Sequence, residues 1–482
     1  MRRNSRSEHV AVGFMPAFRF RKKILCLILN AGIKPTATCL LLLLSLSAAD
    51  RPPVIDAARN GDRDGLRVLL QKGANANAAE ADGSTALHWA SYRDDVESAG
   101  LLIRAGAKIN TANDLGVTPL WTASQNGSEV MVRRLLDAGA NPNAALLAGE
   151  TPVMVAARSG YAAVVEQLIA KGANVNARGT RSQTALMWAV AQKHPEVVKV
   201  LLAHGADIHA RSEVWSQIMA VPPHGYLPYN RSIPAGGETA LMFAAREGDL
   251  ASAKLLVAAG ANVNDADAWG VSATALAAHS GLGDVVEFLL DKGADPNAAG
   301  PGFTALHEAI MRRDEKMVNT LLDHGADANT PLRTWTPTRR SSDDFNFAPE
   351  LVGATPFWLA ARFGQAGVMR LLLKHGADPL FVHHGERTVE GRGEAFVHRT
   401  DVTTALMAAA GMGGGRAWVL PEPSEREALV LEAVKVAVEL GIGLNAANTD
   451  GRTALDSAKT LKYDSVVKFL QEKGAQPGTI KK

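Results

Sequence analysis

Histidine and glutamate residues are concentrated in one short stretch of the sequence, where they could bind a metal ion. The histidines are His383, His384 and His398, and the glutamates are Glu386, Glu390 and Glu394. Imidazole nitrogens and carboxylate oxygens are zinc ligands, but a zinc site also needs a rigid geometry. Because glycines interrupt this stretch, we expect a solvated loop without a metal ion, and metal binding is the alternative.

Two other short motifs could carry catalysis or phosphate binding. Ser465 and Lys468 have the S-x-x-K spacing of a hydrolase nucleophile and its lysine, but this spacing is common within a helix. The run Gly411–Gly415 is similar to a phosphate-binding loop, yet it follows a predicted helix where such loops follow a strand, so we interpret it as a flexible linker. The sequence has no H-E-x-x-H, G-x-S-x-G, C-x-x-C or P-loop motif. We therefore predict no enzyme activity and no cofactor.

Residues 1–49 differ in charge from the rest of the chain. They contain eight Lys and Arg residues and one acidic residue, Glu8, which leaves 43 basic and 48 acidic residues in positions 50–482. Proteins that bind nucleic acid through phosphate contacts carry a basic excess, and residues 50–482 have none. We expect no nucleic-acid partner.

The first 49 residues have the pattern of an export signal. A basic cluster at Arg19–Lys23 precedes the apolar run Cys39–Leu46, and Ser47–Ala49 supplies the small residues that a signal peptidase requires. We expect cleavage near Ala49, a periplasmic or extracellular protein, and no membrane insertion afterwards. The alternatives are a retained membrane anchor over residues 24–49, which Asn30, Lys34 and Pro35 interrupt, and a start at Met15.

A repeat of about 33 residues extends over the remainder, residues 50–482, which we take as a single domain. Thr85, Thr118, Thr151 and Thr184 are spaced by 33 residues, and each opens a short apolar stripe of helical period. A second stripe follows in each unit and ends at a glycine, such as Gly172 or Gly205, which suits the end of a helix. We count eleven such helix-pair units. A helix pair cannot bury its apolar side alone, so the units must stack into a solenoid.

The repeat resembles the ankyrin family. The family pattern D-x-x-G-x-T-P-L-H-x-A-A is met closely by Asp82–Ala90, and V-V-x-x-L-L-x-x-G-A-D-x-N by Val164–Asn176. The resemblance covers about residues 52–475 and implies an all-α curved stack with β-hairpin fingers. It also implies that His88 and His307 stabilise the turn before their helix, and that the chain binds another macromolecule. We expect a protein partner and a monomer.

Four insertions interrupt the repeat, at about 211–237, 331–353, 380–402 and 413–425. The first three share one location, the finger between successive helix pairs, and should emerge from the same edge of the stack. The fourth lies between the two helices of the tenth unit. We expect it to emerge on the opposite edge.

Arginines and inserted aromatic residues are the candidate partner contacts. By analogy with the family, six units place an arginine on the concave face: Arg59, Arg93, Arg158, Arg246, Arg312 and Arg362. The inserted aromatics are Trp215, Tyr226, Tyr229 and Trp335. The arginines could bind carboxylates of a partner, or they could pair with neighbouring acids such as Glu247. The aromatics could wall the groove or fold back on the scaffold.

Two further functions stay open at this point. The insertions could build a pocket with convergent polar groups, which would make the chain a ligand- or carbohydrate-binding protein or an enzyme. Alternatively, the chain could be a secreted effector. Whether the insertions form a pocket or stay as open fingers separates the first of these from a protein-binding scaffold.

Overall fold

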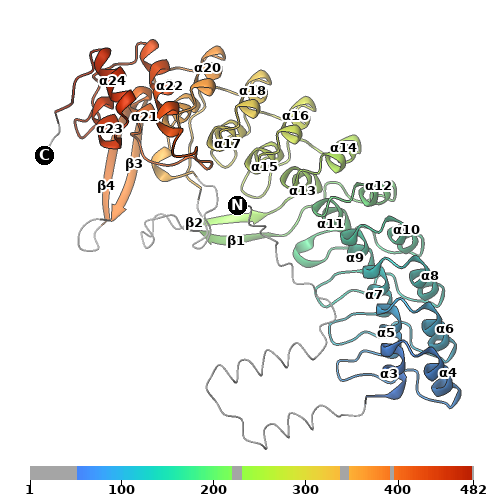
Figure 1. The fold of residues 1–482 in the computed structure, drawn as a ribbon. Coiled ribbons are helices and arrows are strands. Elements are labelled where there is room, and N and C mark those ends of the chain that lie inside the picture. Colours follow the sequence, from blue (N-terminus) through green and yellow to red (C-terminus); the bar gives the residue numbers. More distant parts are fainter. Residues whose placement is uncertain (1–50, 220–230, 337–346, 391–395, 480–482) are drawn as a thin grey trace, which may run out of the picture.

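A computed structural model describes residues 51–219, 231–336, 347–390 and 396–479. Figure 1 shows helix pairs stacked side by side into a curved solenoid, with the first helix of each pair on the concave side. The prediction of eleven helix-pair units is confirmed. The leader, residues 1–49, lies outside the described residues. In the part of the chain that the structure describes, no helix has the length and apolarity needed to cross a membrane.

The concave row contains the first helix of every unit. These inner helices are α3 (Pro53–Asn60), α5 (Ala86–Tyr92), α7 (Pro119–Asn126), α9 (Pro152–Ser159), α11 (Ala185–Ala191), α13 (Ala240–Glu247), α15 (Ala273–Ser280), α17 (Ala305–Arg312), α19 (Pro356–Arg362), α21 (Ala405–Ala409) and α23 (Ala454–Leu461). Each packs on the inner helix of the next unit.

The convex row contains the second helix of every unit. These outer helices are α4 (Arg63–Gln71), α6 (Val96–Arg104), α8 (Glu129–Asp137), α10 (Ala162–Ala170), α12 (Pro195–Ala203), α14 (Leu250–Ala258), α16 (Gly283–Asp291), α18 (Glu315–Asp323), α20 (Ala366–Lys374), α22 (Arg426–Glu439) and α24 (Asp464–Glu472). The inner helices are short and rich in fully buried alanine, such as Ala156 and Ala244, which lets neighbouring helices approach closely.

The residues that define the repeat also start and stop the helices. The side chains of Thr118, Thr184 and Thr355 each accept a hydrogen bond from the backbone N–H three residues later, which satisfies a donor that the helix leaves free. Gly127 ends α7 in the left-handed conformation, with φ of 74°, which costs glycine little. The repeat spacing in the sequence is thus the spacing of the residues that begin and end the helices.

An asparagine amide in the finger connects a unit to the next one at most junctions of the stack. The Asn143 side chain donates to the Gly172 carbonyl (2.9 Å) and accepts from the backbone N–H of Asn174 (2.7 Å). The same paired contacts are made by Asn77, Asn110, Asn176, Asn264, Asn297 and Asn329. We call this series the asparagine ladder. It links the fingers independently of the helix packing.

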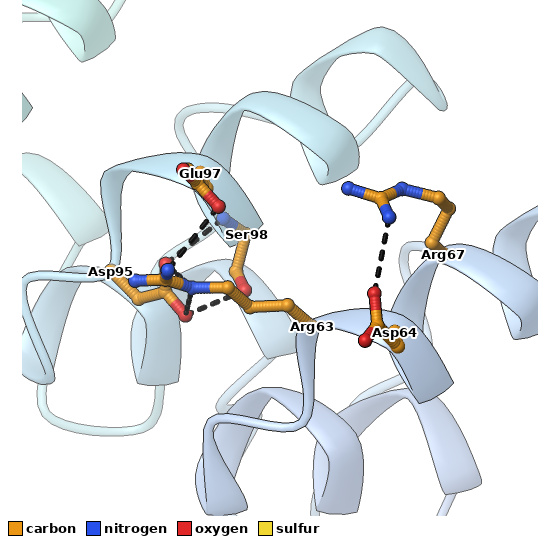
Figure 2. A network of polar contacts seen from close by, with 6 residues as sticks. All are labelled: Arg63, Asp64, Arg67, Asp95, Glu97 and Ser98. Carbon is orange, nitrogen blue, oxygen red and sulfur yellow. Dashed lines mark hydrogen bonds and ion pairs between the residues drawn. The ribbon is translucent and has the colours of Figure 1, made fainter.

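Units one and two are also linked on the convex side, by an ionic network (Figure 2). Arg63 at the start of α4 donates to Asp95, the residue that caps α6, with an Nε–Oδ1 distance of 2.9 Å, and lies 3.2 Å from a carboxylate oxygen of Glu97. Burial by itself raises the pKa of Asp95, but hydrogen bonds from Arg63 and Ser98 outweigh it, so the pKa lies below its usual value. The network ties the first outer helix to the second.

Two of the insertions form antiparallel β-hairpins that project from the finger edge (Figure 1). The first is β1 (Val214–Met219) with β2 (Arg231–Gly236), and the second is β3 (Val382–Glu390) with β4 (Phe396–Thr404). The described part of the insertion at 331–353 forms no strand; it contains a short 3-10 helix, η3 (Pro349–Leu351), that packs beside β3. A similar turn, η1 (Thr180–Ser182), lies in the finger before α11.

The fourth insertion takes a course that we did not predict. Residues 411–421, which include most of this insertion and which we call the strap, turn back along the concave side instead of leaving the opposite edge. The strap passes α19, where Arg362 donates to the Gly414 carbonyl (2.8 Å), and α17, where the Trp418 N–H donates to the Met311 carbonyl (3.0 Å). The expectation failed because these long-range contacts, and not the position of the insertion in the unit, direct its path.

Candidate binding groove

Two of the predicted arginines are held on the faces of tryptophan rings. The guanidinium of Arg59 lies 4.8 Å from the ring centre of Trp89, and that of Arg158 lies 4.6 Å from the ring centre of Trp188. In both pairs the arginine belongs to one unit and the tryptophan to the next. A guanidinium over an indole face is favoured electrostatically and keeps its N–H groups at the edge for other acceptors.

Arg158 and Arg246 also pair with acids of their own units. Arg158 lies 3.3 Å from the carboxylate of Glu150, and Arg246 forms ion pairs with Glu238 and Glu247. The pairing of Arg246 with Glu247 is the alternative that the sequence suggested. Burial raises the pKa of Glu238, while the charge of Arg246 counters that effect.

Arg93 and Arg312 reach back over the preceding unit. The guanidinium of Arg93 lies against Gly61, where a Cβ atom would be 3.1 Å from Nη2. Arg312 donates from Nη1 to the carbonyl of His279 at 2.7 Å. Arg93 and the neighbouring Tyr92, which is 48% exposed, leave polar and aromatic surface accessible on α5.

Arg362, at the end of α19, donates hydrogen bonds to the backbone of the strap. Its Nε donates to the Gly414 carbonyl at 2.8 Å and its Nη2 to the Gly415 carbonyl at 3.1 Å. Burial lowers the pKa of this guanidinium from its usual value. The chain thus fills the concave side around α19 with its own backbone, in the place where we expected a partner to contact Arg362.

The strap closes the concave side further with an aromatic cluster. The Trp418 ring lies 5.1 Å from the rings of His279 on α15 and of Phe347 from the second insertion. Phe347 is 1% exposed and lies 5.2 Å from the ring of Phe303. Aromatic residues of the second insertion therefore fold back on the scaffold, one of the two arrangements that we considered.

The family models match most of this stack. Residues 54–146, 120–212, 226–300 and 299–383 match the model described as ankyrin repeats (3 copies), and residues 186–257 match ankyrin repeats (many copies). The chain belongs to the ankyrin-repeat family. Ankyrin repeats generally mediate protein–protein interactions, and ankyrin scaffolds are typically non-enzymatic.

The relatives share only parts of the chain. An ankyrin repeat and KH domain-containing protein of Caenorhabditis briggsae is 31% identical over 252 residues, which is 49% of this chain and 8% of that protein. An ankyrin repeat-containing protein of Treponema pallidum (strain Nichols) is 43% identical over 94 residues, 19% of this chain and 32% of that protein. The crystal structure of the human ASB11 ankyrin repeat domain is 28% identical, with a TM-score of 0.43, and covers 51% of this chain and 100% of that domain.

The aromatic residues that we predicted as partner contacts of this ankyrin chain lie in different surroundings. Trp215 on β1 lies under the guanidinium of Arg181, 3.9 Å from the ring centre, which links the first hairpin to the preceding finger. Trp335 is 6% exposed and belongs to the buried interior. Tyr226 and Tyr229 lie outside the described residues.

The ankyrin turn histidines have the role that the family implied. Nδ1 of His88 accepts from the Thr85 N–H at 3.0 Å, and its Nε2 lies 3.0 Å from the Val117 carbonyl of the next finger. His307 makes the same contact with the Thr304 N–H at 3.1 Å. These side chains fix the start of an inner helix, so they are structural.

The histidines considered for metal binding do not converge. His383 pairs with Thr403 across the second hairpin, whereas His398 pairs with Thr388 and hydrogen-bonds to its hydroxyl at 3.0 Å. Across residues 51–479, apart from the three undescribed gaps, no group of three potential ligands lies close enough for a metal ion. His383 instead packs on the Trp358 ring, with 4.3 Å between ring centres.

The two remaining motifs have structural explanations. The Ser465 hydroxyl donates to the Glu427 carboxylate at 2.7 Å, which connects α24 to α22. The glycine run is packed against the scaffold, so our interpretation of a flexible linker was wrong. A Cβ atom at Gly413 would be 2.4 Å from the Trp358 ring, and one at Gly415 would be 2.6 Å from Leu351. Glycine is required there because the strap approaches the scaffold so closely.

Proposed function

We propose that the protein is a binding scaffold that recognises a protein partner through the concave face of units one to six, α3 to α14, and the hairpin β1–β2. Arg59, Arg93, Arg158 and Arg246 would contact acidic groups of the partner. The observation that carries this proposal is the contrast between the accessible Tyr92 and Arg93 on α5 and the strap on Arg362. Arg362 is covered by the strap, and Arg312 follows Met311, whose carbonyl the strap contacts, so we leave both out of the proposed contact set.

The electrostatics support a partner with acidic side chains. Guanidinium groups held over aromatic rings are oriented in advance, which reduces the entropy lost on binding. The pairing of Arg158 with Glu150 orients that side chain without burying it fully. Contacts of this kind give an affinity that falls as the salt concentration rises.

Affinity capture from a periplasmic or extracellular extract tests the proposal. Arg93→Glu should weaken capture of the partner by tenfold or more, because it places a carboxylate opposite an acidic surface, as is roughly typical of charge pairs at interfaces. Arg133→Glu on the exposed side of α8 is the matched control and should leave capture unchanged. Equal capture by both variants would show that the concave face is not the binding surface.

The hairpin is tested separately by its removal. Deleting residues 215–235 should reduce partner capture while the helical circular dichroism stays the same. An unfolded deletion variant would show a structural role for the hairpin, through Trp215 and Arg181. An unchanged capture would confine the site to the inner helices.

We also propose that residues 1–49 are a signal peptide that is cleaved near Ala49, so that the scaffold works outside the cytoplasm as a monomer. The basic cluster, the leucine run and Ser47–Ala49 support this. Intact-mass measurement of the native protein should give a chain that starts near Asp50. A full-length chain in the membrane fraction would favour the retained anchor instead.

A further inference from the structure

Three insertions and the last finger line a cavity of about 260 Å³, open to solvent on one side, at the C-terminal end of the stack. Glu350 comes from the second insertion, His383 and Asp401 from the hairpin β3–β4, and Met412 from the strap. The finger before α23 and α23 itself close the other side with Asp450, Arg452 and Leu461. The first of these walls lies outside the regular repeat, so the cavity exists because the insertions meet the last unit here.

His383 provides a buried acceptor on the wall of this cavity. The side chain is 1% exposed, and its Nε2 lies 3.0 Å from the Val352 carbonyl. A carbonyl can only accept, so Nε2 carries the hydrogen and Nδ1 of the neutral ring is left with a lone pair. Burial lowers the pKa of His383, which keeps the ring neutral near pH 7. Among the described residues, Nδ1 has no hydrogen-bond partner.

A second buried acceptor lies close by. The Thr403 hydroxyl, 1% exposed, has no partner among the described residues, and a Cβ atom at Gly413 would be 3.5 Å from its oxygen. Buried polar atoms in proteins are rarely left without a partner, because each costs free energy comparable to a lost hydrogen bond. Nδ1 of His383, a residue that lines the cavity, indicates that a polar molecule completes the site, and the Thr403 hydroxyl lies behind Gly413, another lining residue.

The charges around the cavity select the kind of molecule. Glu350, Asp401 and Asp450 bring three carboxylates, whereas Arg452 is the one cation among the lining residues. Arg452 is bonded to the Thr460 hydroxyl at 2.6 Å, and Asp401 accepts from the Asn448 amide at 3.0 Å. The positive charge of Arg362 lies behind the strap and offsets part of the negative charge. The balance stays negative, so an anion would be repelled and a donor is required.

We propose that this cavity binds a primary ammonium group on a short alkyl chain. The ammonium would donate to Nδ1 of His383, and the carboxylates of Glu350 and Asp450 on the cavity walls would attract its positive charge. Met412 and Leu461 would contact the methylene groups, as apolar surface contacts the stem of a lysine. The chemistry fits a free alkylamine and a lysine side chain of a peptide equally.

A sugar ring fits this cavity less well than an alkyl ammonium. Carbohydrate sites offer an accessible aromatic face, and Trp358, on which the lining residue Gly413 packs, is 0% exposed and covered by His383. The inference is independent of the proposed partner groove, because its walls lie in units nine to eleven.

Calorimetric titration of the chain with three molecules of equal length tests the proposal. The n-pentylammonium ion should bind saturably, whereas n-pentanol and pentanoate should not. Nα-acetyl-lysinamide is the peptide probe. Binding of either amine supports the site, and the tighter of the two identifies a free amine or a peptide as the source. Binding of pentanol as tight as that of the ammonium, or no binding of either amine, would overturn it.

Variants of two lining residues, compared with a control variant outside the cavity, test whether the ammonium binds in the cavity. Glu350→Gln and Asp450→Asn should each weaken ammonium binding by about tenfold, since each removes one negative charge from the cavity wall. Glu386→Gln, on the exposed face of β3, should leave it unchanged. The two cavity variants lie on different elements, so a folding defect in one leaves the other as the test. Ammonium affinities that stay the same in all three variants would refute the assignment.

Discussion

Trp121 in α7 and Trp358 in α19 occupy the same position of the ankyrin unit, three residues after the capping threonine, yet different structures bury them. Trp121 packs with Val117 of the finger before α7, Leu146 of the following finger and Val155 of α9. Trp358 is covered by His383 of the hairpin β3–β4 and by Gly413 of the strap. The regular half of the stack is closed by its repeat, and the C-terminal half is closed by its insertions.

This difference separates two kinds of stabilising contact. In the regular half each unit depends on its immediate neighbours, as in a one-dimensional solenoid. In the C-terminal half Arg362 contacts Gly414, a residue 52 positions later in the chain, and Trp418 reaches α17. The insertions therefore connect units that are not adjacent, and they cover part of the concave surface while they line a polar cavity.

The largest expected effect is the loss of one of these tryptophans. Trp358→Ala should destabilise its region by about 3–5 kcal/mol, as truncation of a buried aromatic residue typically does, and should also release the strap. Trp121→Ala should cost a similar free energy but leave the strap protected. Hydrogen exchange of residues 411–421 distinguishes the two variants. Rapid exchange there in Trp121→Ala would mean that the halves are coupled through the whole stack.

The second expected effect is acid destabilisation at His307, whose ring lies 6.3 Å from that of Phe347 in the second insertion. Burial lowers the pKa of His307 from 6.5 to about 4. The unfolded chain then binds a proton between these values and the folded chain does not, so stability is lost as the pH falls from about 6.5 to about 4. The loss is roughly 3 kcal/mol, because one pKa unit is about 1.4 kcal/mol.

Urea unfolding at pH 7 and pH 4 measures this effect. His307→Gln keeps a side chain that can accept from the Thr304 N–H but cannot titrate, so its stability should depend less on pH than that of the parent chain. An identical pH dependence in the variant would assign the acid sensitivity to other groups, such as the buried His88.

The sequence was sufficient to predict the repeat units but not the path of the strap, and the reason is physical. Thr118 and Gly127 act within one helix, so their spacing reports local structure directly. The path of the strap depends on Arg362 and Met311, which are distant in the chain, and the glycine run has no periodicity that would reveal them. The signal that could have indicated it was the pair Ala417–Trp418, apolar residues within an insertion that we expected to emerge on the opposite edge.

From the sequence we could consider a pocket formed by the insertions, but we could not predict which residues would line it. The shared location of three insertions indicated that they would emerge together, and a pocket was one of their two possible arrangements. Which residues would line it depended on the pairing of β3 with β4, which brings His383 opposite Thr403, and on the strap. Neither the pairing of these strands nor the path of the strap follows from the spacing of residues in the sequence.

The smallest expected effect tests whether an insertion interrupts the coupling between units. Asn143 lies in the regular half, while Asn329 bridges the insertion at 331–353, donating to the Gly376 carbonyl (2.9 Å) and accepting from the Asp378 N–H (2.8 Å). Because both make the same two bonds, Asn143→Ala and Asn329→Ala should each cost about 1–2 kcal/mol in chemical unfolding. Asn319→Ala, which removes one exposed bond to Asp323 on α18, is the control and should cost within about 0.5 kcal/mol of zero. A normal loss at Asn143 with none at Asn329 would show that the insertion has uncoupled units eight and nine, and that the C-terminal half is stabilised by its strap and hairpin instead of its ladder.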